Sequence, residues 1–267
     1  MPAPLHRQAA RALEAVPINV GFARAVVEGT VAGELWADRQ DHPRAFHAVH
    51  PYGMSLVWGE SVDEAADHVL ARLRSRTAGE WLQVDPRSGV DWATALDAVP
   101  LTEHDEHADP GRVVAHTRVN FAFDRAAFTA ARLGLTAPTG WHERPATAAE
   151  FTLPGAVVPS GFWPDAPAFL EHGGGWVVTS RETVGAIAFT SYRTADEVEI
   201  GIETAAAWRR RGLAAAAAAA MIEDLLARGL TPVWSCREDN VASLRLAIAL
   251  GFRPTLRVPY LRIPPRA

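Results

Sequence analysis

Seven consecutive alanines, Ala214–Ala220, constrain the fold of this chain more than any other feature. Alanine is the strongest helix former, and a glycine such as Gly229 is typical of the position just past a helix C-terminus. The apolar run that opens at Gly212 and ends at Arg228 is therefore predicted to be one helix. Its small side chains would let it sit close to a β-sheet.

Strand-like segments lie on both sides of this helix. Before it, Val198, Ile200 and Ile202 alternate with glutamate or glycine, which is the period-two pattern of a half-buried strand. After it, Pro232–Cys236 is predicted to be a second strand. A helical crossover between two strands lets the second run parallel to the first.

The turn between the first strand and the helix is rich in arginine and ends in glycine, in the order Arg209-Arg210-Arg211-Gly212. A helix N-terminus presents unpaired backbone N–H groups and a partial positive charge, and a glycine there lets phosphate oxygens approach the backbone. The three arginines add charge at the same place. This order of elements predicts a site for a pyrophosphate-bearing cofactor.

Arg209, Gly212 and Ala214 fill the three specified positions of the pattern Arg/Gln-x-x-Gly-x-Gly/Ala, so the turn resembles the pyrophosphate loop of the GNAT superfamily of acyl-CoA-dependent N-acyltransferases. The family's next elements follow in order, from Asn240 to the Leu-Gly-Phe that ends at Phe252. The resemblance covers about residues 163–252. Within the superfamily, the segments Phe162-Trp163, 169–176 and Gly212-Leu213-Ala214 look most like the branch that includes zwittermicin-resistance-type acetyltransferases.

The resemblance implies an α/β protein in which residues 136–267 form a GNAT domain, with a mixed, largely antiparallel sheet and flanking helices. In this fold the two parallel strands splay apart, and the pantetheine of acyl-CoA lies between them. The boundary is set by the segment 135–167, which is rich in proline and glycine. Residues 1–135 are predicted to be an α/β domain, which the resemblance implies to be a degenerate GNAT-like half. No cofactor is expected there, because the loop pattern is missing between its strands and helices.

Alternating and apolar runs predict the remaining elements. In the first half they are strands at 33–37, 45–49, 55–58, 80–84 and 113–123 and an amphipathic helix at 62–74. In the second half, residues 175–179 and 184–191 are predicted to form an antiparallel hairpin that turns at residues 181–183 and leads into the strand that starts at Glu197.

The resemblance implies that the cofactor contacts the end of the first strand, the arginine loop, the helix start and the later Asn. These residues are Ile202, Glu203, Thr204, Arg209, Arg210, Arg211, Gly212, Leu213, Ala214, Asn240 and Ser243. The implied cofactor is acetyl-CoA, acting as a co-substrate, and its chemistry requires no metal.

Glu199 and Glu203 share one face of the first strand, because side chains two or four residues apart along a strand point to the same side. A solvated strand face explains them equally well. In the GNAT fold, however, the acceptor amine approaches along this strand and needs a base to take its proton. Glu199 is the predicted base, and Glu203 is predicted to shape the mouth of the cofactor site or to attract a cation.

The acid that protonates the leaving thiolate in many GNAT enzymes is a Tyr seven residues after the motif Asn, and here that position is Ala247. Ser243, one turn earlier on the adjacent helix face, is the candidate side chain, and the only tyrosines are Tyr52, Tyr192 and Tyr260. A thiolate whose conjugate acid has a pKa near 8.5 is also a tolerable leaving group unaided.

Two other groups are interpreted as structural. Cys236 has no local base or orienting group and is predicted to be a small buried residue. Residues 103–107 contain a His-x-x-His with acidic neighbours, but Pro100 and the segment Asp109-Pro110-Gly111 favour a solvated acidic loop over a metal site.

The net charge of -5 and the pI near 6.1 argue against a nucleic-acid surface or an anionic-membrane patch, because both need dense Lys and Arg. Cationic or neutral small partners fit better, and a homo-oligomer stays open. The longest apolar run, Leu213–Ile222, is too short to span a bilayer, and the N-terminus has no apolar core of signal-peptide type. With one cysteine, these features predict a cytoplasmic protein.

The predicted function is direct transfer of an acetyl group from acetyl-CoA to a primary amine of a small molecule. Transfer to a peptide or protein amine is the alternative in the same class. An acyl-CoA-binding module that has lost turnover is the alternative from a different class, and hydrolysis of acyl-CoA is a third.

Overall fold

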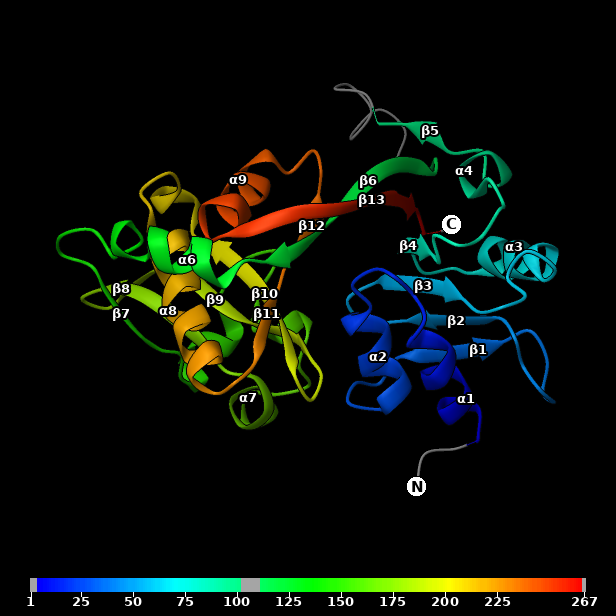
Figure 1. Ribbon diagram of the computed structural model, residues 1–267, viewed down its shortest axis with the longest axis horizontal. Coiled ribbons are helices and arrows are strands. Elements are labelled where there is room, and N and C mark those ends of the chain that lie inside the picture. Colours follow the sequence, from blue (N-terminus) through cyan, green and yellow to red (C-terminus); the bar gives the residue numbers. More distant parts are fainter. Residues whose placement is uncertain (1–3, 102–110, 266–267) are drawn as a thin grey trace. The chain divides into compact units, whose positions relative to one another are not determined.

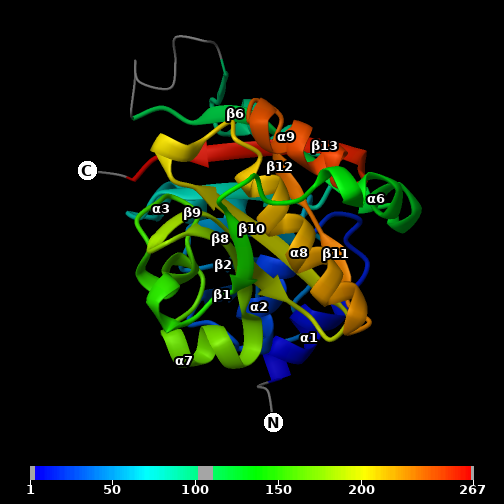
Figure 2. The same ribbon diagram turned by 90° about the vertical axis from the view of Figure 1, so that its left-hand side faces the viewer.

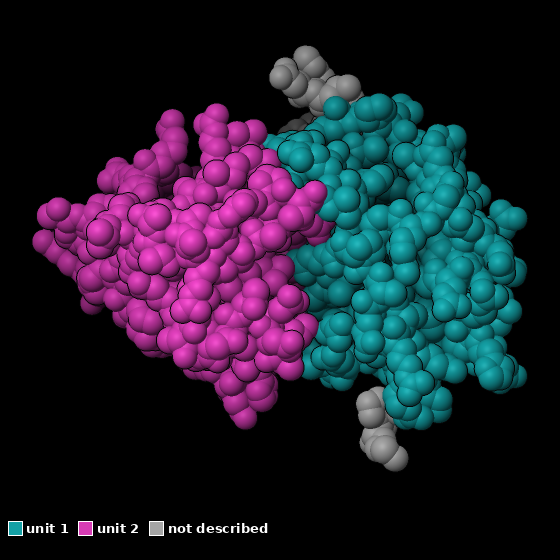
Figure 3. Space-filling view, viewed as in Figure 1, with its two compact units in different colours: residues 1–119, 237–239, 256–267 teal, residues 120–236, 240–255 magenta. Residues whose placement is uncertain are grey.

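Two sheets organise the chain in the computed structural model, which describes residues 4–101 and 111–265 (Figure 1). The chain forms two compact units (Figure 3). Unit 1 contains the residues up to 119, residues 237–239 and the residues from 256 onward. Unit 2 contains residues 120–236 and 240–255.

Unit 2 holds a five-stranded sheet in the order β11-β10-β9-β8-β7. The predicted hairpin is confirmed as β8 (Gly175–Ser180) and β9 (Thr183–Arg193), and it leads into β10 (Glu197–Thr204). All strand pairs are antiparallel except β10 with β11 (Thr231–Val233). The remaining elements are α6 (Arg125–Ala131), β7 (His142–Pro145), α7 (Ala166–Ala168), α8 (Leu213–Ala227), β12 (Ser235–Arg237) and α9 (Val241–Ala249), with short 3₁₀ or π turns between them.

The alanine-rich helix α8 lies across this sheet (Figure 2). It contacts β8, β9, β10 and β11 on the sheet and α9 beside it. Its residues Ala216–Ile222 are all buried, so the helix is apolar around most of its circumference. The predicted close packing is confirmed, because only side chains as small as alanine let one helix bury so many consecutive positions.

The Leu-Gly-Phe segment after α9 has a steric reason. Gly251 has φ +85°, and a Cβ placed there would lie 2.6 Å from the backbone N of Phe128 and 2.9 Å from the carbonyl oxygen of Asp124. Its own carbonyl accepts the N–H of Asp124 at 3.0 Å. Glycine is therefore required both by the left-handed backbone and by the close approach of the α6 N-terminus.

The division into units differs from a single cut at residue 135. Residues 120–135 belong to unit 2, whereas the chain from residue 256 belongs to unit 1. Three of the four unit boundaries fall inside β6 (Val114–Phe123), β12 and β13 (Phe252–Ile263), the fourth falls between β12 and α9, and none falls in the proline-rich connection. That connection, residues 135–167, instead contains β7, which pairs with β8, so it is built into unit 2.

Unit 1 confirms the strands predicted for the first half and adds two helices before them. Its elements are α1 (Pro4–Leu13), α2 (Gly21–Glu28), β1 (Glu34–Ala37), β2 (Phe46–Val49), β3 (Met54–Trp58), α3 (Ala66–Ser75), β4 (Glu80–Val84), α4 (Trp92–Ala95) and β5 (Val99–Pro100), with its shares of β6 and β13. Strands β1, β2 and β3 are antiparallel, and β4 runs parallel to β3 after the α3 crossover. Helix α3 buries Val69, Leu70 and Leu73 in a core with Val57 and Leu82 of the sheet.

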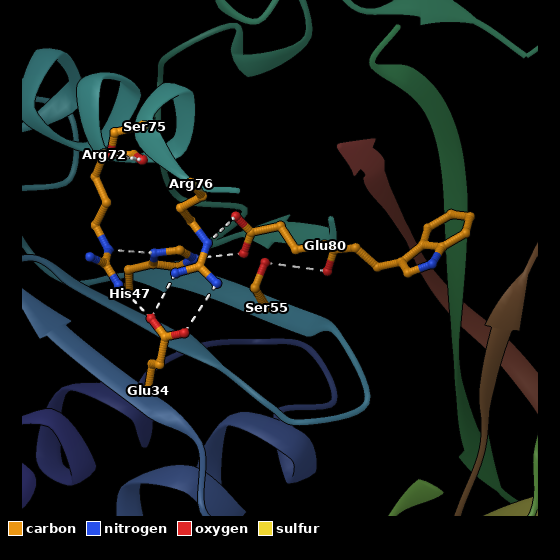
Figure 4. Close-up of polar contacts among 8 residues, drawn as sticks. Glu34, His47, Ser55, Arg72, Ser75, Arg76 and Glu80 are labelled. Carbon is orange, nitrogen blue, oxygen red and sulfur yellow. Dashed lines mark hydrogen bonds and ion pairs between the residues drawn. The ribbon is translucent and has the colours of Figure 1, made fainter. Parts of the chain in front are cut away.

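A buried ionic network joins α3 to the sheet of unit 1 (Figure 4). The side chains of His47 and Glu80 are fully buried, and Nε2 of His47 lies 3.1 Å from Oε2 of Glu80. Arg76 pairs with Glu80 at 3.1 Å and with Glu34 at 2.7 Å. Arg72 donates through Nε to Nδ1 of His47 at 3.1 Å, so His47 is the neutral tautomer with its proton on Nε2.

Burial controls the protonation of this network. Burial lowers the pKa of His47 from its usual 6.5, more than the carboxylate of Glu80 raises it. For Glu80, burial favours the protonated acid, but hydrogen bonds from His47 and Ser55 and the charge of Arg76 outweigh it and hold the pKa below its usual range. Both groups therefore bind protons more readily in the unfolded chain than in the folded one, so their contributions to stability are lost as the pH falls.

The His47→Gln variant tests the histidine part of this dependence. In the wild type the contribution of His47 is complete above about pH 6.5, where the unfolded histidine is neutral, and it declines at lower pH. Glutamine keeps a donor and an acceptor but does not titrate, so its apparent melting temperature should fall less between pH 7 and pH 5 than that of the wild type. Thermal denaturation at several pH values measures the difference. His68→Gln, at an exposed position on α3, should fall as the wild type does; equal slopes for His47→Gln and wild type would contradict the assignment.

Candidate functional site

Strand β11 is paired with only the first three residues of β10. The parallel register joins Glu197, Val198 and Glu199 to Thr231, Pro232 and Val233. Beyond that point β10 continues to Thr204. The backbone that follows β11 passes through Trp234 into β12, which is not a strand of this sheet. In the described part of the chain, no strand pairs with the last five residues of β10 on that side. The two strands therefore diverge, as the GNAT resemblance implied.

The arginine loop brings an open helix N-terminus next to this divergence. Gly212 is the N-cap of α8, has φ +79° and accepts the N–H of Ala216 at 3.1 Å. No heavy atom lies within 4 Å of where a Cβ on Gly212 would be, so the space in front of it is open. The first turn of a helix leaves N–H groups without intrahelical acceptors. The N–H groups of Leu213 and Ala214 are at this position, and Gly212 before them has no side chain to cap them.

The three arginines of the loop are exposed, and two of them have defined neighbours. Arg209 donates through Nε to the carbonyl of Thr204 at 3.2 Å, and its guanidinium lies 3.5 Å from Glu203. Arg211 stacks over the ring of Trp208 at 4.7 Å. Arg210 has φ +61°, which turns the backbone ahead of Gly212. The positive charge predicted for this loop is therefore present at the entrance to α8.

Three other residues that the sequence predicts to contact the cofactor lie at the start of α8 and near the end of β10. The side chain of Leu213 is buried, and a Cβ on Gly185 would lie 2.5 Å from its Cδ1, so Leu213 is part of the core under the helix. Ile202 and Thr204 lie on the part of β10 that β11 does not reach, opposite Ala188 and Ala186 of β9. Their backbone groups border the divergence.

The face of β10 that carries Glu199 is covered rather than solvated. Glu199 is 6% exposed. Gly201, two residues further along β10, lies on the same face and leaves room for the ring of Phe189. A Cβ on Gly201 would lie 2.6 Å from that ring. That ring packs edge-on against Phe162, which also packs against Tyr192, the residue opposite Glu199 in β9. The interpretation of this face as a solvated strand surface is wrong for Glu199.

Two serines hold Glu199. Oε1 of its carboxylate accepts a hydrogen bond of 2.7 Å from Oγ of Ser235, the first residue of β12. Its backbone carbonyl accepts one of 3.0 Å from Ser191. The β9 register steps from Tyr192 to Thr190 at this point, so Ser191 is the extra residue of a bulge. The sequence pattern did not single out either serine, and only the place of Ser235 at the end of the predicted second strand hinted at it.

Glu203 lies in a different environment. Its Oε2 accepts the backbone N–H groups of Ala156 and Val157 at 3.0 and 3.1 Å, and its Oε1 accepts that of Thr204 at 3.1 Å. Gly155 is in close contact with it, since a Cβ there would lie 2.8 Å from Cγ of Glu203. The carboxylate therefore holds the 155–157 segment against β10, which agrees with a role in shaping the site.

The segment after β11 also connects to α9. Asn240 is the N-cap of α9, and its side chain accepts the N–H of Ser243 at 3.1 Å. Oγ of Ser243 accepts the indole N–H of Trp234 at 3.2 Å, and a hydroxyl that accepts one bond still has its own proton to donate. Trp234 is hydrogen-bonded to Ser243, and the next residue, Ser235, is hydrogen-bonded to Glu199. The two candidate residues are therefore bonded to neighbouring positions of one segment. Ala247 is fully buried, so a tyrosine ring there would require the core to repack.

Cys236 is buried and reduced. Residues 103–107 lie outside the described residues. Over residues 4–101 and 111–265, no group of three or more His, Cys, Asp or Glu side chains is arranged to hold a metal ion. No helix in that part of the chain combines the length and apolarity needed to cross a membrane.

Unit 1 repeats the strand-helix-strand order without these features. Its parallel strands β3 and β4 stay paired from Met54 to Val57, and the N–H of Asp85 extends the pairing by a bond of 2.8 Å to Val57. The turn before α3 carries Glu60, Asp63 and Glu64 in place of arginines. Closed strands leave no gap for a pantetheine, and acidic side chains at a helix start oppose a phosphate.

Comparison with known proteins agrees with this topology. Residues 143–259 match the family model described as GNAT acetyltransferase. A GCN5-related N-acetyltransferase-like protein from Streptococcus suis aligns over 98% of this chain and 99% of its own, with 22% identity and a TM-score of 0.71. A tandem GNAT protein from the clavulanic acid biosynthesis pathway aligns over 98% of this chain and 94% of its own, with 15% identity and a TM-score of 0.54. A search of curated proteins finds no match.

At these identities the structural similarity shows the fold, and it extends over both halves of the chain. The predicted fold class is therefore confirmed, with a GNAT fold in the C-terminal half and a GNAT-like N-terminal half. The assignment to the zwittermicin-resistance-type branch stays a prediction.

The Glu203→Ala variant tests whether this carboxylate holds the 155–157 segment. Removing it leaves the N–H groups of Ala156 and Val157 without their acceptor, so hydrogen exchange at both amides should become faster by about tenfold or more. Amide exchange followed by NMR or mass spectrometry measures this. Glu197→Ala, at an exposed position on the same strand, is the matched control and should leave both amides as they are. Unchanged exchange in Glu203→Ala would show that other contacts hold the segment.

Proposed function

We propose that this protein is an acyltransferase that moves an acetyl group from acetyl-CoA to a primary amine of a small molecule, through the domain at residues 143–259 that matches the GNAT acetyltransferase family model. The observation that carries this proposal is the divergence of β10 and β11 after Glu199 and Val233, directly beside the open N-terminus of α8. A gap between strands next to an anion-binding helix start suits a long thioester with a pyrophosphate at one end.

The pyrophosphate is assigned to the loop from Arg209 to Ala214. Its backbone N–H groups and three arginines supply hydrogen bonds and positive charge, and Gly212 keeps the approach open. Ile202, Glu203 and Thr204 border the gap on the β10 side, and Asn240 and Ser243 are assigned to its far side. Acetyl-CoA supplies the activated acyl group. The proposal specifies an acetyl group rather than a longer acyl chain.

Glu199 is proposed as the general base. A protonated amine must lose its proton before its lone pair can attack a thioester, and a carboxylate sheltered from water can accept that proton. Direct transfer follows, because holding amine and thioester together supplies proximity. Backbone N–H groups on the open edge of β10 are suited to polarise the thioester carbonyl. Ser243 is proposed to donate a proton to the departing thiolate.

A binding module without turnover is the second candidate, and the buried Ala247 favours it, since the usual acid has no counterpart at that position. Its prediction is tight binding of acetyl-CoA with no release of free CoA. Transfer to a peptide or protein amine and hydrolysis differ from the main proposal only in the acceptor.

The Gly212→Asp variant tests the cofactor loop. Acetyl-CoA at about a hundred times its Kd should stabilise the wild type by roughly 2.7 kcal/mol, which thermal denaturation detects. The variant places a carboxylate where the pyrophosphate is assigned and should lose this shift. Gly229→Asp is the matched control, because Gly229 has φ +74° and open space as Gly212 does, but lies at the other end of α8. A full acetyl-CoA response in Gly212→Asp would reject the loop assignment.

The Glu199→Gln variant tests the function and the base together. With acetyl-CoA and a panel of amines, the wild type should release free CoA only when an amine is present. Glutamine keeps the shape and removes the basicity, so kcat/KM at neutral pH should drop by roughly 10² to 10⁴ with little change in acetyl-CoA affinity.

Release of CoA without an amine would indicate a hydrolase, and tight binding without any release would indicate the binding module. Full turnover in Glu199→Gln would leave the transferase standing and transfer the role of base to another group or to solvent.

A further inference from the structure

Ser235 lies where the backbone connection between the diverging strands ends. Glu199 and Val233 are the last paired residues of β10 and β11. Ser235 is two residues past Val233, so its side chain lies on the same face as those of Val233 and Glu199. Its Oγ donates to Oε1 of Glu199 at 2.7 Å. A side-chain hydrogen bond thus continues the connection one step beyond the last backbone pair.

The surroundings of Glu199 make this hydrogen bond consequential. The residue is 6% exposed, next to the aromatic group formed by Phe162, Phe189 and Tyr192. With so little water present, fixed protein donors determine how a carboxylate is oriented and how strongly its ionised form is favoured. Ser191 fixes the backbone of Glu199 and Ser235 fixes its carboxylate, so the two hydroxyls have separable effects.

We propose that Ser235 is a positioning residue that orients the Glu199 carboxylate and keeps it ionised for proton transfer from the acceptor amine. This inference rests on the proposed role of Glu199 as the base. The proton moves from the ammonium nitrogen of the acceptor to the carboxylate of Glu199. The amine lone pair then forms the C–N bond while the C–S bond breaks and its electrons leave with the thiolate, and the second proton that the nitrogen loses on becoming an amide passes to that thiolate. Ser235 donates a hydrogen bond throughout and loses no proton.

A purely structural role is the competing explanation. In that case the hydroxyl would only connect β10 to β12, and its loss would lower stability without affecting the protonation of Glu199. The proton affinity of the carboxylate separates the two, because a donor to the ionised form lowers the pKa of a carboxyl group and its removal raises it.

The test is a titration of the protein labelled with ¹³C at the glutamate carboxyls, followed by NMR, with the Glu199 signal identified by its loss in Glu199→Gln. This measurement needs no acceptor. In Ser235→Ala the midpoint of that signal should rise by about one pH unit, the size expected for one lost hydrogen bond to a charged group. Ser235→Thr keeps the hydroxyl and should titrate as the wild type does. Ser191→Ala removes the neighbouring hydroxyl that bonds the backbone carbonyl of Glu199 and should leave the midpoint in place.

With acetyl-CoA and an amine that the wild type accepts, the acid limb of kcat/KM should move upward in Ser235→Ala by the same amount. A folded Ser235→Ala with the wild-type midpoint overturns the inference, whereas a loss of turnover in Glu199→Gln would leave the proposed function intact. Full turnover in Glu199→Gln overturns the inference together with the role of Glu199 as the base, and leaves the transferase activity standing. If Ser235→Ala does not fold, Ser235→Cys supplies a side chain of similar size with a weaker donor, and it should give a smaller upward shift; no shift there overturns the inference.

Discussion

The end of backbone pairing between β10 and β11 is the constraint on which the candidate site depends. Two parallel strands normally stay together because each backbone N–H and C=O needs a partner. Here the backbone that follows β11 leaves the sheet after Val233. Trp234 is then hydrogen-bonded to Ser243 of α9, and Ser235 is hydrogen-bonded to Glu199. The unpaired edge of β10, the start of α8 and the carboxylate of Glu199 are brought together by that one departure.

The alanine-rich helix makes the departure tolerable. Because α8 is buried along Ala216–Ile222, it covers the sheet closely from β8 to β11 and supplies the packing that strand pairing no longer provides at the gap. The same helix begins at Gly212, so the element that stabilises the sheet also directs its N-terminus to the site. On the other face of β10, Phe189 fills the space above Gly201 and shelters Glu199.

Unit 1 has the same order of elements but lacks the diverging strand pair and the arginine-glycine turn. Its parallel strands remain paired, its turn is acidic, and the charged side chains that it buries serve packing between α3 and the sheet. Arg76 is ion-paired with Glu80, and the neutral His47 is hydrogen-bonded to the same carboxylate, so the charge of Glu80 is compensated within the unit. Two GNAT-like halves of one chain have thus diverged at the strand pair and at the helix start, which are the two places where a cofactor would be held.

The sequence by itself determined the elements whose signals are local. Period-two alternation located β8, β9 and β10, the alanine run located α8, and the arginine-glycine turn located the helix start, because each depends on residues within a few positions of one another. It also suggested Glu199, but could not decide between a solvated face and a sheltered one. Only the tertiary structure decided that, because Glu199 is 6% exposed and its carboxylate is bonded to Ser235, which lies 36 residues away in the chain. The hydrogen bond between Glu199 and Ser235 and the attachment of residues 155–157 to Glu203 likewise arise from contacts between residues far apart in the chain, which no local pattern records. So do the unit boundaries that fall inside β6, β12 and β13.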